Sequence, residues 1–324
     1  MASLALTLLR GAALSPFKRP RPDAPLPGPT TARVRTDIDH LVAYERLCGF
    51  AAGQGIGTST GRSADGAGAT GADPLPPTYP HVLAFPQTMR LMAARAFPLP
   101  LLGLVHTSVA IVQHRAPLPD EELELTAYAR RLTPHRRGTE VTITTTATVA
   151  GETVWESHST YLSRHRTSAE HPQQTPAPTP GAPLPARAEW HLPADLGRRY
   201  ATVSGDRNPI HLRPATARPF GFPRAVAHGM WTFARCVAEH SGIAVGDEPL
   251  YLSAEFRAPV LLPGTVTYAA EGAAFELRGA AESGGRVHVT GSVTRTAPPS
   301  DRRDPPRRSS SGSPRPGSRT PTAG

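Results

Sequence analysis

The run YATVSGDRNPIHLRPATARPFGFPRAVAHGM, residues 200–230, decides how the second half of this chain folds. It joins the end of a helix predicted over Ala194–Ser204 to the start of a helix predicted over Ala227–Glu239. The second helix is apolar on nearly every side, so we expect it to be buried. The polar turn between the two helices therefore leads directly to a buried helix.

Asp206 and His211 are the candidate catalytic pair within this turn. They lie five residues apart. Pro209 is expected to stop the preceding helix and to disfavour helix at Asn208, which predicts a turn that aims both side chains at one point. One carboxylate and one imidazole suit general acid–base chemistry on a single water molecule. Asn208 is placed to orient the Asp206 carboxylate or that water.

Gly229 is the candidate oxyanion donor. The sequence Ala-His-Gly-Met at residues 227–230 opens the buried helix, where N–H groups are free and the positive end of the helix dipole lies. A glycine there lets a bulky thioester approach the backbone, and its N–H can stabilise a thioester enolate. We expect His228 to bond the loop that carries His211 rather than to transfer a proton.

The chain contains a similar pattern twice. Three segments of the first half match three segments of the second half in the same order, which indicates a duplicated domain. The pairs are residues 37–44 with the run that ends at Tyr200, Tyr79–Ala84 with Phe222–Ala227, and Arg115–Pro119 with Arg257–Pro263.

Both halves also have the same order of predicted elements, helices first and then Thr- and Val-rich strands, which is typical of an α+β fold with a helix on one face of an antiparallel sheet. The helices predicted in the first half are Asp37–Cys48 and Val82–Ala96. The predicted strands are Val105–His114, Leu123–Leu132, Val141–Val149 and Thr153–Ser163, then Tyr251–Phe256, Val266–Glu271, Ala274–Ala281 and Val287–Thr296.

Segments rich in Pro, Gly or Arg divide the chain. We expect disordered basic tails over residues 1–30 and 298–324, a Gly-rich insertion over 53–77 and a Pro-rich linker over 167–186. Two folded blocks, 31–166 and 187–297, remain between these segments. The insertion lacks the Gly-Lys-Ser/Thr ending of a phosphate-binding loop.

The charge distribution argues against specific nucleic-acid binding. The formal net charge is +9, but the two tails carry +3 and +4, which leaves +2 for the residues between them. The two cysteines, Cys48 and Cys236, are too few for a disulfide framework or a metal site, which fits a reducing cytoplasm. Arg10 interrupts the apolar N-terminal run, so no membrane span is expected there.

The second half resembles the MaoC-like dehydratases, the family of R-specific enoyl-CoA hydratases. The family signature is present as Ser-Gly-Asp-x-Asn-Pro-x-His over Ser204–His211, Gly221-Phe222, and His-Gly-Met over His228–Met230. The resemblance covers residues 190–296. The first half, especially residues 83–106, resembles the degenerate N-terminal half of double-hot-dog 3-hydroxyacyl-thioester dehydratases.

This resemblance implies a double hot-dog fold of class α+β, with two tandem domains that each wrap an antiparallel sheet around a long helix. Residues 31–166 would be a degenerate, catalytically inactive domain and residues 187–297 the catalytic domain. The implied reaction is reversible hydration of trans-2-enoyl thioesters to (3R)-hydroxyacyl thioesters of CoA or acyl carrier protein, in fatty-acid metabolism, without a metal or redox cofactor.

The resemblance also assigns roles within the site. Asp206 and His211 would act on the water and the α-carbon, Asn208 would assist, and Gly229 would hold the thioester oxygen. The residues expected to line the substrate pocket are Ser204, His228, Met230 and Ser253, the last on a strand that we expect to face the buried helix.

Two other functions share the expected fold: a hot-dog thioesterase, and a non-catalytic protein that binds acyl thioesters or a partner. The first usually lacks the Asp-x-Asn-Pro-x-His turn, and the second would leave the catalytic set free to vary. Two hot-dog domains in one chain mimic a homodimer, so a monomer and a dimer of chains are both open.

Overall fold

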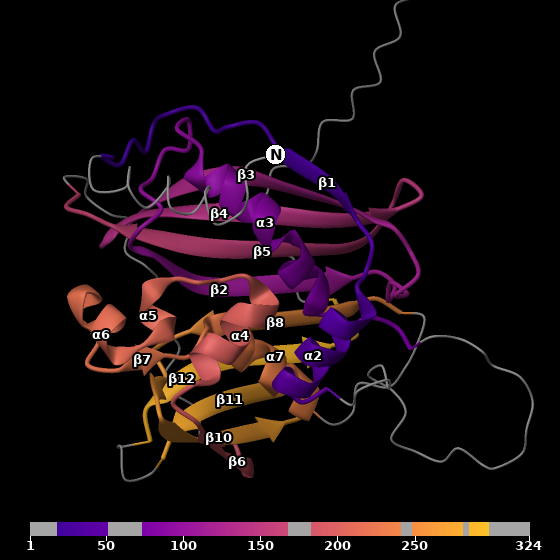
Figure 1. The fold of residues 1–324 in the computed structure, drawn as a ribbon, viewed down its shortest axis with the longest axis vertical. Coiled ribbons are helices and arrows are strands. Elements are labelled where there is room, and N and C mark those ends of the chain that lie inside the picture. The colour runs from indigo at the N-terminus through magenta and orange to yellow at the C-terminus, as the bar shows by residue number, and fades with distance from the viewer. Residues whose placement is uncertain (1–17, 51–72, 168–182, 241–247, 281–284, 298–324) are drawn as a thin grey trace, which may run out of the picture.

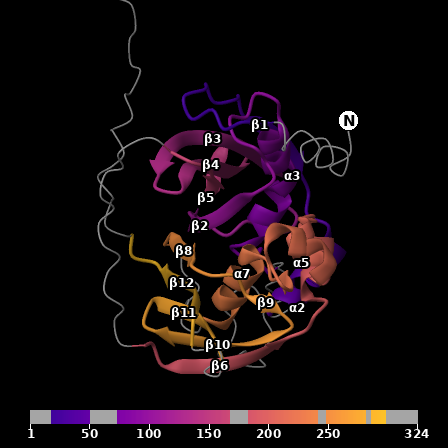
Figure 2. The ribbon, with the colours of Figure 1, turned by 90° about the vertical axis from the view of Figure 1, so that its left-hand side faces the viewer.

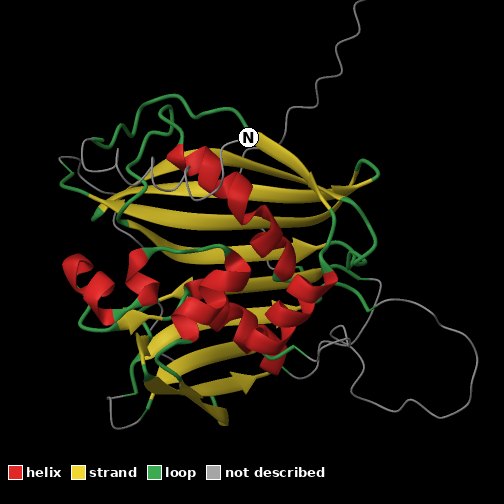
Figure 3. Cartoon of the chain, viewed as in Figure 1, coloured by secondary structure: helices red, strands yellow, loops and turns green. Residues whose placement is uncertain are grey.

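The chain forms one ten-stranded sheet with its helices on one face (Figures 1 and 3). The computed structural model describes residues 18–50, 73–167, 183–240, 248–280 and 285–297. The strands of the sheet are β1 (Thr30–Val34), β2 (Leu104–Gln113), β3 (Leu123–His135), β4 (Gly138–Val149), β5 (Glu152–Arg164), β6 (Ala186–Leu192), β8 (Leu250–Phe256), β10 (Gly264–Glu271), β11 (Ala274–Gly279) and β12 (Val287–Thr294).

The helices and two further short strands lie on one face of the large sheet (Figure 3). The helices are α2 (Ile38–Cys48), α3 (Tyr79–Ala93), α4 (Leu196–Ser204), α5 (Pro209–Leu212), α6 (Pro214–Ala217), the 3-10 turn η2 (Arg218–Phe220) and α7 (Gly229–Glu239). A separate two-stranded sheet pairs β7 (Ala225–Val226) with β9 (Leu261–Leu262). None of the described helices has the length and apolar character needed to cross a bilayer.

The strand order shows the internal duplication directly. It is β1-β3-β4-β5-β2 in the first half and, read from the opposite edge, β6-β10-β11-β12-β8 in the second. The two halves meet in the middle, where Ser108–Gln113 of β2 pair antiparallel with Leu250–Glu255 of β8. The sheet curls around α3 in one half and α7 in the other (Figure 2). The predicted double hot-dog fold is therefore confirmed.

One apolar core joins the two halves. It includes Tyr44 and Trp155 of the first half together with Phe233 and Phe275 of the second. On β8, alternate residues such as Leu252 and Ala254 are buried in this core, as expected for a strand with one face against helices. The fold therefore places α4 and α7 of the second half close to elements of the first.

The predicted helices and strands are present with end shifts of a few residues, but two strands of the large sheet, β1 and β6, were not predicted. Both are edge strands, paired only with β3 and β10 respectively. Most of their residues are partly or fully exposed. A strand of this kind lacks the apolar pattern by which strands are usually recognised.

Part of the chain expected to be disordered is packed. The Lys18 ammonium donates to the Ala94 carbonyl and the Arg21 N–H to the Pro98 carbonyl, so residues 18–30 lie against the first half. At the end of the Gly-rich insertion, Leu75 is buried and the Trp155 indole donates to the Pro77 carbonyl. The predictions for residues 1–17, 53–72, 168–182 and 298–324 lie outside the described residues.

We expect Gly291→Ala to destabilise the second half of the sheet. Gly291 pairs with Phe275 of β11 and Ala254 of β8, and a Cβ atom would collide with the Phe275 ring and the Ser253 carbonyl. Overpacking of this kind lowers the free energy of unfolding by about 1–3 kcal/mol. Chemical denaturation measures the loss. Gly28→Ala is the control, because a Cβ there meets no atom within 4 Å. Equal stability of both variants would contradict the register of β8, β11 and β12.

Candidate active site

The turn that carries Asp206 begins at a glycine cap. Helix α4 ends at Ser204, and Gly205 adopts the left-handed conformation that commonly ends helices, with φ of 74° and its N–H bonded to Ala201 O. The prediction that Pro209 ends this helix is therefore wrong. Pro209 instead starts α5, a position that suits proline because its missing N–H is not needed there.

Backbone amides hold the Asp206 turn in shape. The Asn208 N–H donates to Asp206 Oδ1 at 3.0 Å, so it is the Asn208 backbone that orients this carboxylate. The Asn208 side chain accepts from the Ile210 N–H and caps α5. The Ser204 hydroxyl donates to Tyr200 O and accepts from the Asp206 N–H. These bonds give Ser204 a part in holding the turn, and its predicted contact with substrate stays a prediction.

His211 is buried, and its tautomer is fixed. Its Nδ1 lies 2.7 Å from the Val226 carbonyl oxygen, which can only accept, so Nδ1 carries the proton. The other nitrogen, Nε2, is then an acceptor. Burial lowers the pKa of His211, although the Asp206 charge and the bond to Val226 oppose this effect. The ring is thus neutral near pH 7 and presents a basic nitrogen.

His228 contacts both members of the candidate catalytic pair, Asp206 and His211. Its ring stacks on His211 with centroids 3.7 Å apart, and its Nε2 donates to the Asp206 carbonyl at 3.0 Å. Burial and the neighbouring His211 lower the pKa of His228 to about 3, so it stays neutral. The predicted bond between His228 and the loop around His211 matches this contact to the Asp206 backbone.

Gly229 begins α7, whose first N–H groups have no acceptor within the helix. A Cβ at this position would lie 3.1–3.2 Å from the Phe256 ring, so glycine lets the helix end approach β8 closely. Met230, the next residue, is buried in the shared core.

Ser253 does not face α7, so the expectation that it lies on the helix side of its strand is wrong. The strand alternates, and Leu252 and Ala254 occupy the helix side of β8. The Ser253 hydroxyl lies on the other face, 2.9 Å from the Ser292 hydroxyl. The sequence predicted the strand but not which of its two faces is turned toward the helix, and a shift of one residue along a strand exchanges these faces.

Gly197 supports the site and was not noticed in the sequence. A Cβ at Gly197 would collide with the carbonyl oxygen of His211. This glycine therefore lets α4 pack directly against the backbone that carries His211. No motif marks it, because its partner is distant in sequence and is brought to it only by the fold.

The first half also contributes to the surroundings of Asp206. The Asp206 charge acts on His81 of α3, His106 of β2 and Tyr161 of β5. No local motif in the sequence marks His81 or His106 as part of these surroundings. Helix α3 begins at Tyr79 rather than at the predicted Val82, and Pro86 lies inside it.

Three groups of the site are close enough to share an ion. The carboxylate of Asp206 and ring nitrogens of His211 and His228 lie within 4.8 Å of one another. However, His211 Nδ1 and His228 Nε2 already bond backbone carbonyls. The other ring nitrogens remain as acceptors beside the Asp206 carboxylate: His211 Nε2, and His228 Nδ1, which is buried without a partner among the described residues. This arrangement can orient one water molecule.

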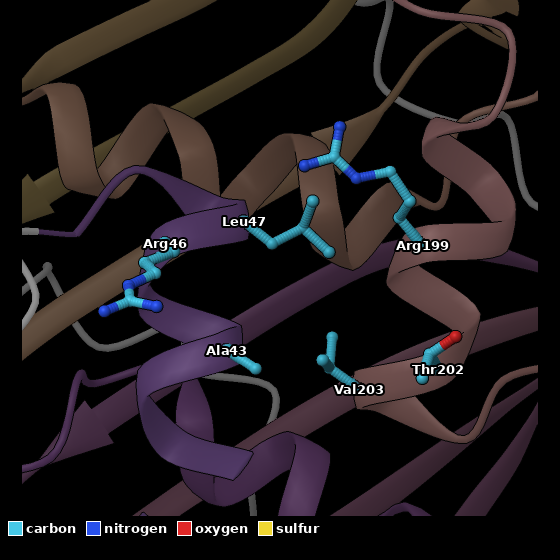
Figure 4. A pocket seen from close by; sticks show the side chains of 6 residues that line it. All are labelled: Ala43, Arg46, Leu47, Arg199, Thr202 and Val203. Carbon is cyan, nitrogen blue, oxygen red and sulfur yellow. The ribbon is translucent and has the colours of Figure 1, made fainter. Parts of the chain in front are cut away.

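An open hollow of about 400 Å³ lies elsewhere, between α2 and α4. Ala43, Leu47 and Val203 form its apolar part, and the side chains of Arg46 and Arg199 lie on either side of Leu47 (Figure 4). The catalytic residues do not line it.

Known proteins resemble this chain in sequence. The family described as MaoC like domain matches residues 173–291. The curated 3-hydroxyacyl-thioester dehydratase X of Mycobacterium tuberculosis (strain ATCC 25618 / H37Rv) is 38% identical over 200 residues, which are 61% of this chain and 70% of that protein.

Solved structures extend the similarity to nearly the whole fold. The crystal structure of HtdX from Mycobacterium tuberculosis has a TM-score of 0.65 and 32% identity, covering 82% of this chain and 98% of that one. A MaoC-like dehydratase from Phytophthora capsici shares the fold, with a TM-score of 0.62 and 18% identity over 85% of this chain and 96% of its own. The chain belongs to the family of MaoC-like dehydratases.

Proposed function

We propose that this protein is a hydro-lyase that reversibly adds water to trans-2-enoyl thioesters and so forms (3R)-hydroxyacyl thioesters in fatty-acid metabolism. The observation that carries the proposal is the proximity of a carboxylate oxygen of Asp206 to a ring nitrogen of the neutral His211, which lie within 4.8 Å of each other. Family membership and the name of the relative, a 3-hydroxyacyl-thioester dehydratase, support it. The substrate would be carried by CoA or acyl carrier protein in the cytoplasm.

Asp206, His211 and Gly229 would each have a different role in the hydration reaction. The Asp206 carboxylate and His211 Nε2 hold one water between them, and His211 Nε2 takes a proton as the water oxygen bonds to C3. The C2–C3 double-bond electrons move toward the thioester carbonyl, and the Gly229 N–H stabilises the resulting enolate oxygen. His211 then returns the proton to C2 on the same face, which regenerates its neutral form.

His228 and Asn208 would act indirectly, by holding Asp206 and His211 in position. His228 holds the Asp206 backbone and supports the His211 ring, and Asn208 fixes the carboxylate through its N–H. Residues 187–297 would form the catalytic domain. Residues 31–166 would form an inactive domain that completes the sheet and shapes the acyl pocket.

Asp206→Asn and His211→Ala should each lower kcat/KM for crotonyl-CoA hydration by about a hundredfold or more, since each removes one member of an acid–base pair. Loss of the conjugated thioester absorbance measures hydration, and an R-specific dehydrogenase identifies the product. Ser253→Ala, on the outer face of β8, should keep wild-type activity. If wild-type protein hydrates neither CoA nor acyl-carrier thioesters, the proposed function is wrong.

The pH dependence should reveal His211. Only its neutral form accepts a proton, and its pKa lies below the usual 6.5 because the ring is buried. We therefore expect kcat/KM to hold as the pH falls to 6.5 and to decline only in more acidic solution. Initial rates measured across this range would show it, with circular dichroism to confirm that the protein stays folded. An acidic limb centred at or above 6.5 would contradict His211 as the base.

Gly197→Ala should reduce kcat by about tenfold to a hundredfold, because α4 would push the His211 backbone away from its working position and misplacement of a catalytic group by about 1 Å is costly. Steady-state kinetics on folded protein test this. Gly28→Ala is again the control, since it adds the same methyl group in open space. Unchanged kcat would show that Gly197 does not position His211.

A further inference from the structure

A second group of polar rings lies beside the catalytic turn and belongs to the first half. His81 and His106 are stacked with centroids 6.3 Å apart, and His106 stacks on Tyr161 at 4.5 Å. His106 pairs with Tyr161 across β2 and β5, next to an irregularity in the ladder between His106 and Ser108. We call His81, His106 and Tyr161 the polar triad.

The polar triad is connected to the catalytic residues through Phe256. The His106 ring lies 4.9 Å from the Phe256 ring, which in turn closes on the start of α7 at Gly229. The charge of Asp206 acts on all three members of the triad. A thioester with its carbonyl at Gly229 and its C3 at Asp206 and His211 would extend its acyl chain past Phe256 toward the triad.

Two atoms of the polar triad are buried without a partner. His81 is 8% exposed, and its Nδ1 has no hydrogen-bond partner among the described residues. His106 Nε2 is also enclosed and without a partner within the same part of the chain. Buried polar atoms are nearly always paired, and an unpaired one costs about 1–3 kcal/mol. Two such atoms beside a catalytic turn point to a ligand that pairs them.

The charge state of the polar triad limits what that ligand can be. Burial lowers the pKa of His81 to about 4 and that of His106 to about 3, and it raises the pKa of Tyr161. All three side chains are therefore neutral at physiological pH and offer both donors and acceptors. The nearby carboxylate of Asp206 disfavours an anionic ligand. A neutral oxygen group satisfies both conditions.

We propose that the polar triad binds a hydroxyl or keto oxygen carried by the acyl chain beyond C3, so that the enzyme prefers oxygenated enoyl thioesters. This inference rests on the proposed function and names its substrate class. A site built to hydrogen-bond a substrate oxygen rejects the analogue that lacks it, because its own polar groups are then left unpaired. An acyl chain without such an oxygen would leave the buried nitrogens of His81 and His106 without a hydrogen-bond partner.

The test compares the full-length wild-type protein on trans-2-octenoyl-CoA and on the same thioester carrying a hydroxyl or keto group at C5, C6 or C7. We expect kcat/KM to be at least about tenfold higher for one or more of the oxygenated chains. Hydration of the unsubstituted chain with no such preference would overturn this inference and leave the proposed function standing. Hydration of none of them, nor of the matching acyl-carrier thioesters, would refute the proposed function itself.

Variants connect the preference to the polar triad. His106→Phe keeps a ring between Tyr161 and Phe256 but removes the nitrogens, and Tyr161→Phe removes only the hydroxyl. At least one should reduce the advantage of the oxygenated chain by about tenfold. His158→Phe is the matched control, because His158 lies on the other face of β5, bonded to Thr144 and Glu156. A ratio that neither triad variant changes would show that the triad holds only water, and would overturn the proposal.

Discussion

The antiparallel pairing of β2 with β8 is the contact on which the rest of the molecule depends. It joins two five-stranded halves into one sheet and gives all the main helices a common face to cover. The resulting apolar core is continuous across the junction between the two halves, since it contains residues of both. Because of this continuity, α3 of the first half lies beside the turn of the second half that carries Asp206.

Burial then sets the chemistry of that turn. In water, stacked histidines near a carboxylate would tend to take up a proton, but here desolvation outweighs the attraction of Asp206 and keeps the rings of His211 and His228 neutral. Each ring uses one nitrogen to bond a backbone carbonyl, which fixes its tautomer and its orientation. The proposed catalytic pair, Asp206 and His211, is therefore arranged before any substrate arrives.

The sequence could reveal what is local and repeated. The Ser204–His211 run, the glycine at the start of α7 and the duplicated order of elements all depend on neighbours within a few residues, and each appears in the structure. The sequence could not reveal contacts that depend on distant register: Gly197 against the His211 carbonyl, the outward direction of Ser253, or the approach of His81 and His106 to Asp206. The edge strands β1 and β6 were missed for a different reason, because only one neighbour pairs with each and little of either is buried.

The central junction also has a consequence for what each half could do alone. Without the first half, β8 would present a row of unpaired backbone N–H and C=O groups along its whole length, a template for any strand of matching twist. Another copy of the same half offers such a strand in the same geometry. The fused chain can thus be seen as a dimer made permanent by covalent linkage, in which each half protects the open edge of the other.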